Sequence, residues 1–132
     1  MAAYKNLRAV YGSSAVAAID AGVTCVKGQK QRTYTVVDAW VRAHGTASGT
    51  TTSVDISDTS NTIKAVVFTR AGLSNHATLR AGTATTGVAT NLGKPLTAEE
   101  GIMIKTVGAA LATTTDIEWC VLYTVTPTVA TV

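Results

Sequence analysis

Two adjacent carboxylates, Glu99 and Glu100, stand in the stretch "KPLTAEEGIMIKTV" of a chain rich in Thr, Ala, Val and Gly. Paired carboxylates can act as acid and base when they flank a scissile bond, roughly 5–10 Å apart. Neighbours on a strand point to opposite faces, and neighbours in a helical turn are about 100° apart. The spacing therefore favours a turn, in which Thr97 caps and Glu100 is its capping-box partner. Gly101 ends this turn before a strand starts, so we predict that Glu99→Gln is mild and Gly101→Val harms folding.

A second cluster of oxygen ligands, Asp55, Asp58 and Asn61, repeats every three residues in "VDISDTSN". Such oxygens could hold a hard cation, but the spacing differs from that of an EF-hand loop. We favour a hairpin whose Asp and Ser side chains cap backbone amides. No metal and no cofactor is expected.

The two histidines, His44 and His76, each lie beside turn residues. Nothing in the sequence pairs either of them with a carboxylate or a nucleophile. The chain has no GxSxG elbow, P-loop, HExxH or GxGxxG motif before a helix. These observations predict a protein that is not an enzyme.

Three basic residues, Lys27, Lys30 and Arg32, lie close together in "VKGQKQR", in a chain of net charge +3. They could contact phosphate, but no aromatic residue lies among them for base stacking. A solvated hairpin tip is the favoured interpretation, and contact with an acidic patch on a protein partner is a further one. No direct nucleic-acid partner is expected.

Alternation with a period of two marks most of the chain as strands. In "TYTVVDAWVRA" it predicts a core face formed by Thr33, Thr35, Val37, Ala39, Val41 and Ala43. In "IEWCVLYTV" both faces are largely apolar after Glu118, which predicts a strand that is central or that a neighbour covers on its outer face. Trp119 should lie in the core, whereas Trp40 shares its face with Asp38 and Arg42 and should not lie deep.

Short strands separated by turn clusters predict an all-β fold, an antiparallel β-sandwich of jelly-roll type, over residues 23–132. Residues 1–22 differ from the rest of the chain in their residue pattern and are predicted to form an N-terminal arm or a short helix. In the helical alternative, Ser13 or Ser14 caps the helix and Gly22 ends it.

Charged residues make up only 14% of the 132 residues, against about 25% in an average soluble domain. So little charge on a β-rich chain suggests that another subunit or partner covers part of the surface. No run approaches the roughly 20 apolar residues of a membrane helix, and no secretory signal is recognised. Cys25 and Cys120 lack zinc spacing and are expected to be thiols that act as small, buried hydrophobic side chains.

Four segments together resemble the small β-sandwich decoration (cement) proteins of tailed bacteriophage capsids. They are, in order, "YTVVDAWVRAHGTAS", "VDISDTSNTIKAVVF", "NLGKPLTAEEGIMIKTVGAA" and "IEWCVLYTV". The resemblance covers roughly residues 33–125 and consists of turn and strand texture rather than catalytic signatures. It implies a virion protein, made in the host cytoplasm, that sits on the capsid surface and contacts the major capsid protein. It also implies a homo-oligomer, a trimer rather than a dimer, with no membrane partner.

Residues expected at such an interface come from the N-terminal region, the basic run and one tryptophan: Tyr4, Lys5, Arg8, Tyr11, Lys27, Lys30, Arg32 and Trp40. Two alternatives have the same texture. One is another phage particle component, such as a head-fibre base, a small coat protein or a tail subunit. The other is a glycan-binding β-sandwich module, although aromatic residues are only 5% of the chain.

Overall fold

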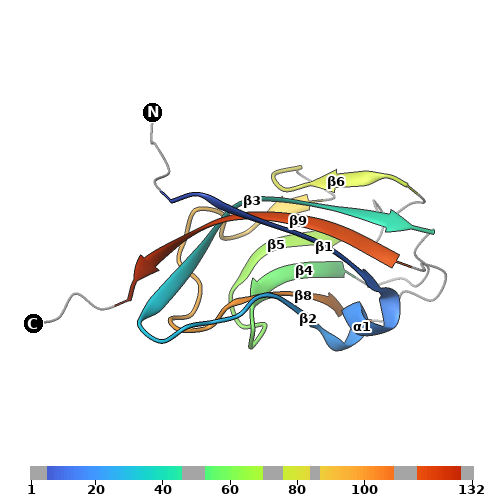
Figure 1. Cartoon of the computed structure of the whole chain (residues 1–132). Helices are drawn as coiled ribbons and strands as arrows, with labels where there is room; N and C mark the ends of the chain where they lie inside the picture. Colours follow the sequence, from blue (N-terminus) through green and yellow to red (C-terminus); the bar gives the residue numbers. More distant parts are fainter. Residues whose placement is uncertain (1–5, 46–52, 70–75, 84–86, 109–115, 129–132) are drawn as a thin grey trace, which may run out of the picture.

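The computed structural model describes residues 6–45, 53–69, 76–83, 87–108 and 116–128, and these form two antiparallel sheets packed face to face (Figure 1). The all-β sandwich predicted from the sequence is confirmed. One short helix, α1 (Val16–Ala21), closes one end of the sandwich between the sheets. No helix in the described ranges is long and apolar enough to span a membrane.

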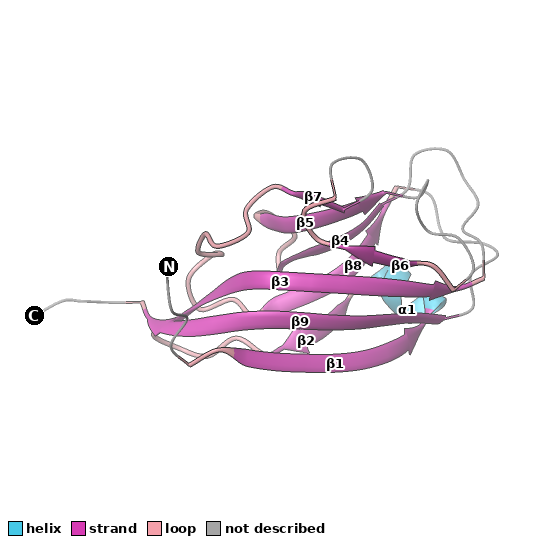
Figure 2. Cartoon of the chain, turned by 90° about the horizontal axis from the view of Figure 1, so that it is seen from above, coloured by secondary structure: helices cyan, strands magenta, loops and turns pink. Residues whose placement is uncertain are grey.

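The four-stranded sheet has the order β1-β9-β3-β6. Its strands are β1 (Arg8–Ala15), β9 (Asp116–Pro127), β3 (Arg32–His44) and β6 (Thr78–Arg80). Seen from above, β9 runs between β1 and β3 over most of its length (Figure 2). The central position predicted for β9 from its two apolar faces is confirmed.

The five-stranded sheet has the order β2-β8-β4-β5-β7. Its strands are β2 (Val23–Val26), β8 (Ile102–Val107), β4 (Ser53–Asp58), β5 (Lys64–Thr69) and β7 (Gly87–Ala89). Only the connections β4–β5 and β7–β8 join strands of the same sheet, so the chain passes repeatedly from one sheet to the other.

The core lies between the sheets and is supplied by alternate residues of both. From β9 come Ile117, Trp119, Val121 and Tyr123, as alternation predicts. Their partners on the opposite sheet are mostly β-branched and aromatic, and include Val54, Ile56, Phe68, Ile102 and Ile104. Ile19 of α1 is also fully buried, so the helix seals the end of this core.

A β-bulge in β3 changes which residues of that strand face the core. The register with β9 shifts between Val36 and Asp38, so the alternation is interrupted there. Ala39, Val41 and Ala43 point inward as predicted, but Tyr34 and Val36 are buried in place of Thr33, Thr35 and Val37. The predicted core face is therefore wrong for the first half of the strand, because strict alternation cannot reveal an inserted residue.

The N-terminal region contains both a strand and a helix. Residues Arg8–Ala15 pair with β9 along their whole length, and α1 follows directly. Gly22 ends the helix with φ of 103°, as predicted. The predicted serine cap is wrong, because the N-cap is Ala15, which forms no side-chain capping bond, and Ser13 and Ser14 belong to β1.

Candidate functional site

The adjacent glutamates reach two different turns and do not face each other across a cleft. Glu99 has a φ of 67°, and its Oε2 accepts a hydrogen bond of 2.7 Å from the amide of Gln31 in the β2–β3 turn. Glu100 Oε1 accepts one of 2.7 Å from the amide of Ser60 in the β4–β5 turn. The two glutamates therefore hydrogen-bond the turn before β8 to the β2–β3 and β4–β5 turns, as expected of residues that position a strand.

The predicted capping box at this turn is wrong in its side-chain contacts. Thr97 Oγ1 donates to Asp58 Oδ2 at 2.5 Å, and the Glu100 carboxylate is engaged by Ser60. Only the backbone turn is formed, with the Glu100 amide 3.2 Å from the Thr97 carbonyl oxygen. The sequence placed the turn correctly, but the side chains bind a loop about 40 residues away in the sequence.

Two glycines, Gly28 and Gly101, allow the backbone after β2 to approach the backbone at the end of this turn closely. A Cβ on Gly101 would lie 1.8 Å from the Val26 carbonyl oxygen, and one on Gly28 would lie 2.3 Å from the Glu99 carbonyl oxygen. Since real Cβ atoms do not come that close to backbone, both positions require glycine. This close approach holds the "EEG" turn against the end of β2.

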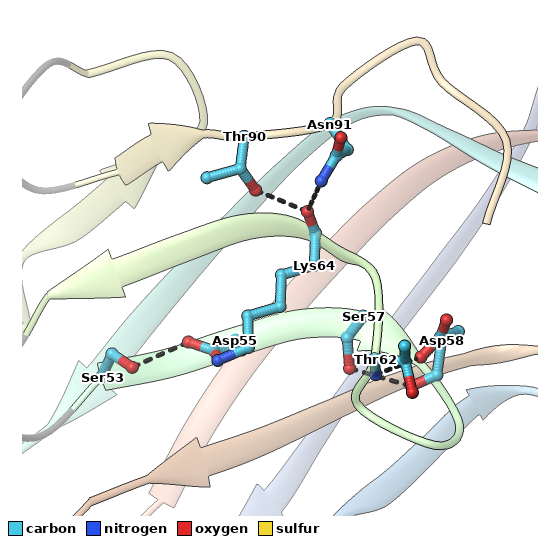
Figure 3. A network of polar contacts seen from close by, with 8 residues as sticks. All are labelled: Ser53, Asp55, Ser57, Asp58, Thr62, Lys64, Thr90 and Asn91. Atoms are coloured by element: carbon cyan, nitrogen blue, oxygen red, sulfur yellow. Dashed lines mark hydrogen bonds and ion pairs between the residues drawn. The ribbon is translucent and has the colours of Figure 1, made fainter. Parts of the chain in front are cut away.

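Asp58 organises the hairpin between β4 and β5 (Figure 3). Its Oδ1 accepts from the Thr62 amide at 2.7 Å and its Oδ2 from the Ile63 amide at 3.0 Å. Burial alone would raise the pKa of Asp58, but the hydrogen bonds from Thr97, Thr62, Ile63 and Ser60 outweigh it and lower the pKa below its ordinary value. The predicted hairpin cap is confirmed for Asp58, whereas the hydroxyls of Ser57 and Ser60 donate to Asp58 rather than cap a backbone amide.

Asp55 makes a separate contact on the same strand. Lys64 Nζ lies 2.9 Å from Asp55 Oδ2, and Ser53 Oγ donates to Oδ1 at 2.8 Å (Figure 3). Asp55 is fully buried, so its charge depends on this lysine for compensation. Within the described ranges, no group of three or more His, Cys, Asp or Glu residues is arranged to hold a metal ion.

The structure brings both histidines together beside a glutamate. His44 Nε2 lies 2.7 Å from Glu118 Oε1, and the His44 and His76 rings meet edge to face with centroids 5.1 Å apart. The hydrogen bond with His44, together with the charges of His44 and Arg42, lowers the pKa of Glu118 below its ordinary value. Sequence reasoning missed this contact, because it arises only when the ends of β3 and β9 pair.

The outer face of the four-stranded sheet carries an aromatic pair that the sequence did not reveal. Cys120 on β9 is paired in register with Tyr11 on β1 and with Trp40 on β3. The rings of Tyr11 and Trp40 lean toward each other over this position, with centroids 5.9 Å apart and planes inclined by 58°. Tyr11 is 64% exposed, so much of this apolar surface faces outward.

Neither cysteine is an activated thiol. Burial, with a smaller contribution from the charge of Asp38, raises the pKa of Cys120. Burial also raises the pKa of Cys25 to about 12. A thiol with a raised pKa carries little of the thiolate that reacts or binds metal. Both cysteines are free thiols, as expected, but they are only partly buried, so the predicted full burial is wrong.

The predicted interface residues fall into separate regions of the molecule. Tyr11 and Trp40 lie together on the outer face, and Arg8 is exposed at the start of β1. The basic residues Lys27, Lys30 and Arg32 are exposed around the β2–β3 turn, at the opposite end of β3 from His44. Tyr4 and Lys5 lie outside the described residues. Among the predicted residues that the structure describes, Tyr11 and Trp40 have side chains in ring-to-ring contact.

Comparison with protein-family models, with curated proteins and with solved structures finds no match to the chain.

Proposed function

We propose that this chain is a non-enzymatic structural protein of a virus particle, a capsid decoration protein that binds the outer face of a phage head as a homo-oligomer. The observation that carries the proposal is the outer face of the four-stranded sheet, where Tyr11 and Trp40 form a partly exposed aromatic pair. Aromatic residues are enriched at protein interfaces and often anchor them. The major capsid protein is the proposed partner.

The strand order supports the proposal. The chain passes repeatedly between sheets with the orders β1-β9-β3-β6 and β2-β8-β4-β5-β7. We propose that this is a jelly-roll winding, in which β7 is an additional edge strand. Jelly rolls recur in viral capsid and lectin domains. The likeness is one of architecture, and the function is argued from the exposed face.

The roles of the polar residues also support a structural protein. Glu99, Glu100 and Asp58, which could have formed an acidic site, are each bonded to turn backbone. A catalytic site needs titratable groups that converge where a substrate can bind. These carboxylates instead fix the loops at one end of the sandwich.

A decoration protein stabilises its capsid by mass action. Binding only to the assembled lattice contributes RT ln(1 + [L]/Kd) per site, about 2.7 kcal/mol when the free protein is at a hundredfold excess over Kd. Many sites on one particle multiply this effect. The interface therefore needs shape and a few anchoring side chains rather than reactive groups.

The experiment is cosedimentation of the purified protein with phage heads that lack it, followed by heating of the decorated and bare heads. We expect saturable binding and a higher disruption temperature for decorated heads. Trp40→Ala should weaken binding, whereas Val88→Ala, on an edge of the opposite sheet, should not. Absence of sedimentation with heads would reject the proposal, and spontaneous assembly of the protein into shells or tubes would indicate a coat or tail subunit.

A glycan-binding module is the second candidate, and the same aromatic pair favours it. Sugar rings stack on exposed aromatic faces, and the strands around this pair also carry Arg42 and Glu118, which could hydrogen-bond hydroxyl groups. A glycan array separates the candidates. Binding to one sugar class that is lost in Trp40→Ala would support the module, and a blank array would dismiss it.

A further inference from the structure

Strand β1 forms a long free edge of the four-stranded sheet. It pairs with β9 from Arg8 to Ala15 without any register shift, and it ends the sheet order. In an antiparallel ladder, alternate residues direct their N–H and C=O groups away from the paired neighbour. Within the described ranges no strand pairs with that second side of β1.

This edge lacks the features that usually keep sheet edges apart. The other edge strands are short: β6 and β7 have three residues each, and β2 has four and a bulge. β1 has eight residues, "RAVYGSSA", with no proline or bulge and with one charged side chain, Arg8, at its start. A long, regular edge without such protection is a template for pairing with another strand.

Exposed apolar side chains gather at the same edge. The described residues have three exposed large hydrophobic side chains: Leu7 at 47%, Tyr11 at 64% and Val88 at 37%. Leu7 directly precedes β1, and Tyr11 lies within it. Both would lose contact with water if a strand were added alongside β1.

The sequence of the edge is complementary to itself. Its first half carries the larger side chains Leu7, Arg8, Val10 and Tyr11, and its second half carries Gly12, Ser13, Ser14 and Ala15. When such a strand pairs antiparallel with its own copy about Tyr11, each of the other large side chains meets a small one. The central residue meets itself, as the symmetry of a two-fold interface requires.

We infer that β1 pairs antiparallel with β1 of a second copy of this chain, about a two-fold axis at Tyr11. The register places Val10 opposite Gly12, Arg8 opposite Ser14, and Leu7 opposite Ala15 of the second copy. The pairing would form about eight backbone hydrogen bonds, since on average one forms per residue of an eight-residue ladder. It joins the two four-stranded sheets into one continuous sheet.

The choice of register follows from the faces of the sheet. The outer faces of the two four-stranded sheets lie on the same side of the joined sheet only in some registers. In those registers, each outward-pointing residue of one β1 pairs with an outward-pointing residue of the other β1. A Tyr11-centred register meets this condition and covers both Leu7 and Tyr11. The comparable register centred on Gly12 would place Leu7 opposite position 17, which lies in α1, and would leave Leu7 unpaired.

This inference does not rest on capsid binding, because it concerns the purified protein alone. It differs from the trimer that the resemblance implies, since a two-fold contact between identical edges closes with two subunits. In the dimer, the Tyr11–Trp40 pairs of both copies would lie on one outer face, on either side of the axis.

The first test is the mass of the purified chain by light scattering and sedimentation equilibrium. We expect a dimer for the natural protein and a monomer for Tyr11→Lys, in which two like charges would face each other across the axis. Val88→Lys introduces the same charge at an exposed edge residue of the other sheet and should remain a dimer. A monomeric or trimeric natural protein, or a dimeric Tyr11→Lys with a native circular dichroism spectrum, would overturn the inference.

A second test fixes the register and remains decisive if Tyr11→Lys does not fold. In a Cys25→Ala, Cys120→Ala background, Tyr11→Cys places two thiols directly opposite each other, within reach of a disulfide. Ser13→Cys on the same strand face would place its two thiols about 13 Å apart along the strands, because they are offset by four residues. Mild oxidation should cross-link Tyr11→Cys rapidly and Ser13→Cys hardly at all. Equal cross-linking, or none in Tyr11→Cys, would reject the two-fold pairing at Tyr11.

Discussion

At the scale of single residues, Asp58 has the densest set of polar contacts in the described chain. Its carboxylate accepts hydrogen bonds from the amides of Thr62 and Ile63 and from the hydroxyls of Thr97 and Ser60. The residue is fully buried. Three segments of the chain therefore depend on one carboxylate: β4, the following turn and the loop before β8. Buried donors that lose their acceptor cost about 1–3 kcal/mol each.

We predict that Asp58→Asn lowers the free energy of unfolding by about 2–3 kcal/mol at pH 7, since one oxygen acceptor becomes a donor. The folded-state pKa of Asp58 is lowered, so its stabilisation is fully present above the unfolded pKa of about 3.9 and is lost as pH falls through the folded value. The difference between variant and natural protein should therefore shrink toward pH 2. Urea unfolding at several pH values measures it, with the exposed Asp116→Asn as the control. A difference independent of pH would contradict the role given to the charge.

A second residue-scale prediction concerns the turn before β8. Gly101→Val should lower the free energy of unfolding by more than about 4 kcal/mol or prevent folding, because its Cβ would overlap the Val26 carbonyl oxygen. Glu99→Gln should change it by less than about 1 kcal/mol, since the amide oxygen can still accept from Gln31. Thermal melts compare the two variants. Equal shifts in Tm would show that the close approach does not govern this turn.

At the scale of elements, α1 begins without a side-chain cap. Ala15 has the extended backbone of an N-cap residue, with φ of −61° and ψ of 149°, but it has no side-chain oxygen to accept a hydrogen bond from the first-turn amides. We predict that Ala15→Ser stabilises the protein by about 0.5–1 kcal/mol. Ala17→Ser, inside the exposed first turn, should be neutral or slightly destabilising. Chemical denaturation of the three proteins tests this, and the reverse order would contradict the cap assignment.

Most elements could be predicted from the sequence, and the exceptions have physical causes. β3 and β9 were predicted from their alternation, and the turn before β8 and the hairpin between β4 and β5 were predicted from their turn residues. The strand β1 was missed because "RAVYGSSA" has mostly small side chains and no clear alternation of apolar and polar residues. On its inward side the Trp119 ring lies against Gly12 and fills the space that a large side chain of β1 would otherwise occupy. The bulge in β3 was missed because only pairing with β9 shows which residue is inserted.

The candidate site could be predicted only in part, for a related reason. The sequence identified Tyr11 and Trp40 as separate interface candidates and placed Trp119 in the core. It could not show that Tyr11 and Trp40 meet over Cys120, because that contact requires the register of three strands at once. The His44–Glu118 contact depends on the same pairing.

At the scale of the whole molecule, the N-terminal segment is part of the sandwich. A separate arm would be dispensable for folding, whereas β1 covers one side of β9 and its Gly12 lies against the Trp119 ring. We predict that deletion of residues 1–15 prevents native folding or makes the protein aggregate. Near-ultraviolet circular dichroism and tryptophan fluorescence measure this, and deletion of residues 1–5 is the control. A truncated chain with native spectra would restore the arm interpretation.

The central place of β9 has a consequence for how the protein is made. A ribosome synthesises β1 and β3 long before the strand that must lie between them. Until residues 116–127 emerge, the four-stranded sheet cannot form, and the nascent chain carries strands without their native neighbours. Folding should therefore start late in synthesis, after β9 has emerged, rather than proceed in stages along the chain. Before β9 emerges, the nascent chain is most exposed to aggregation with other nascent chains.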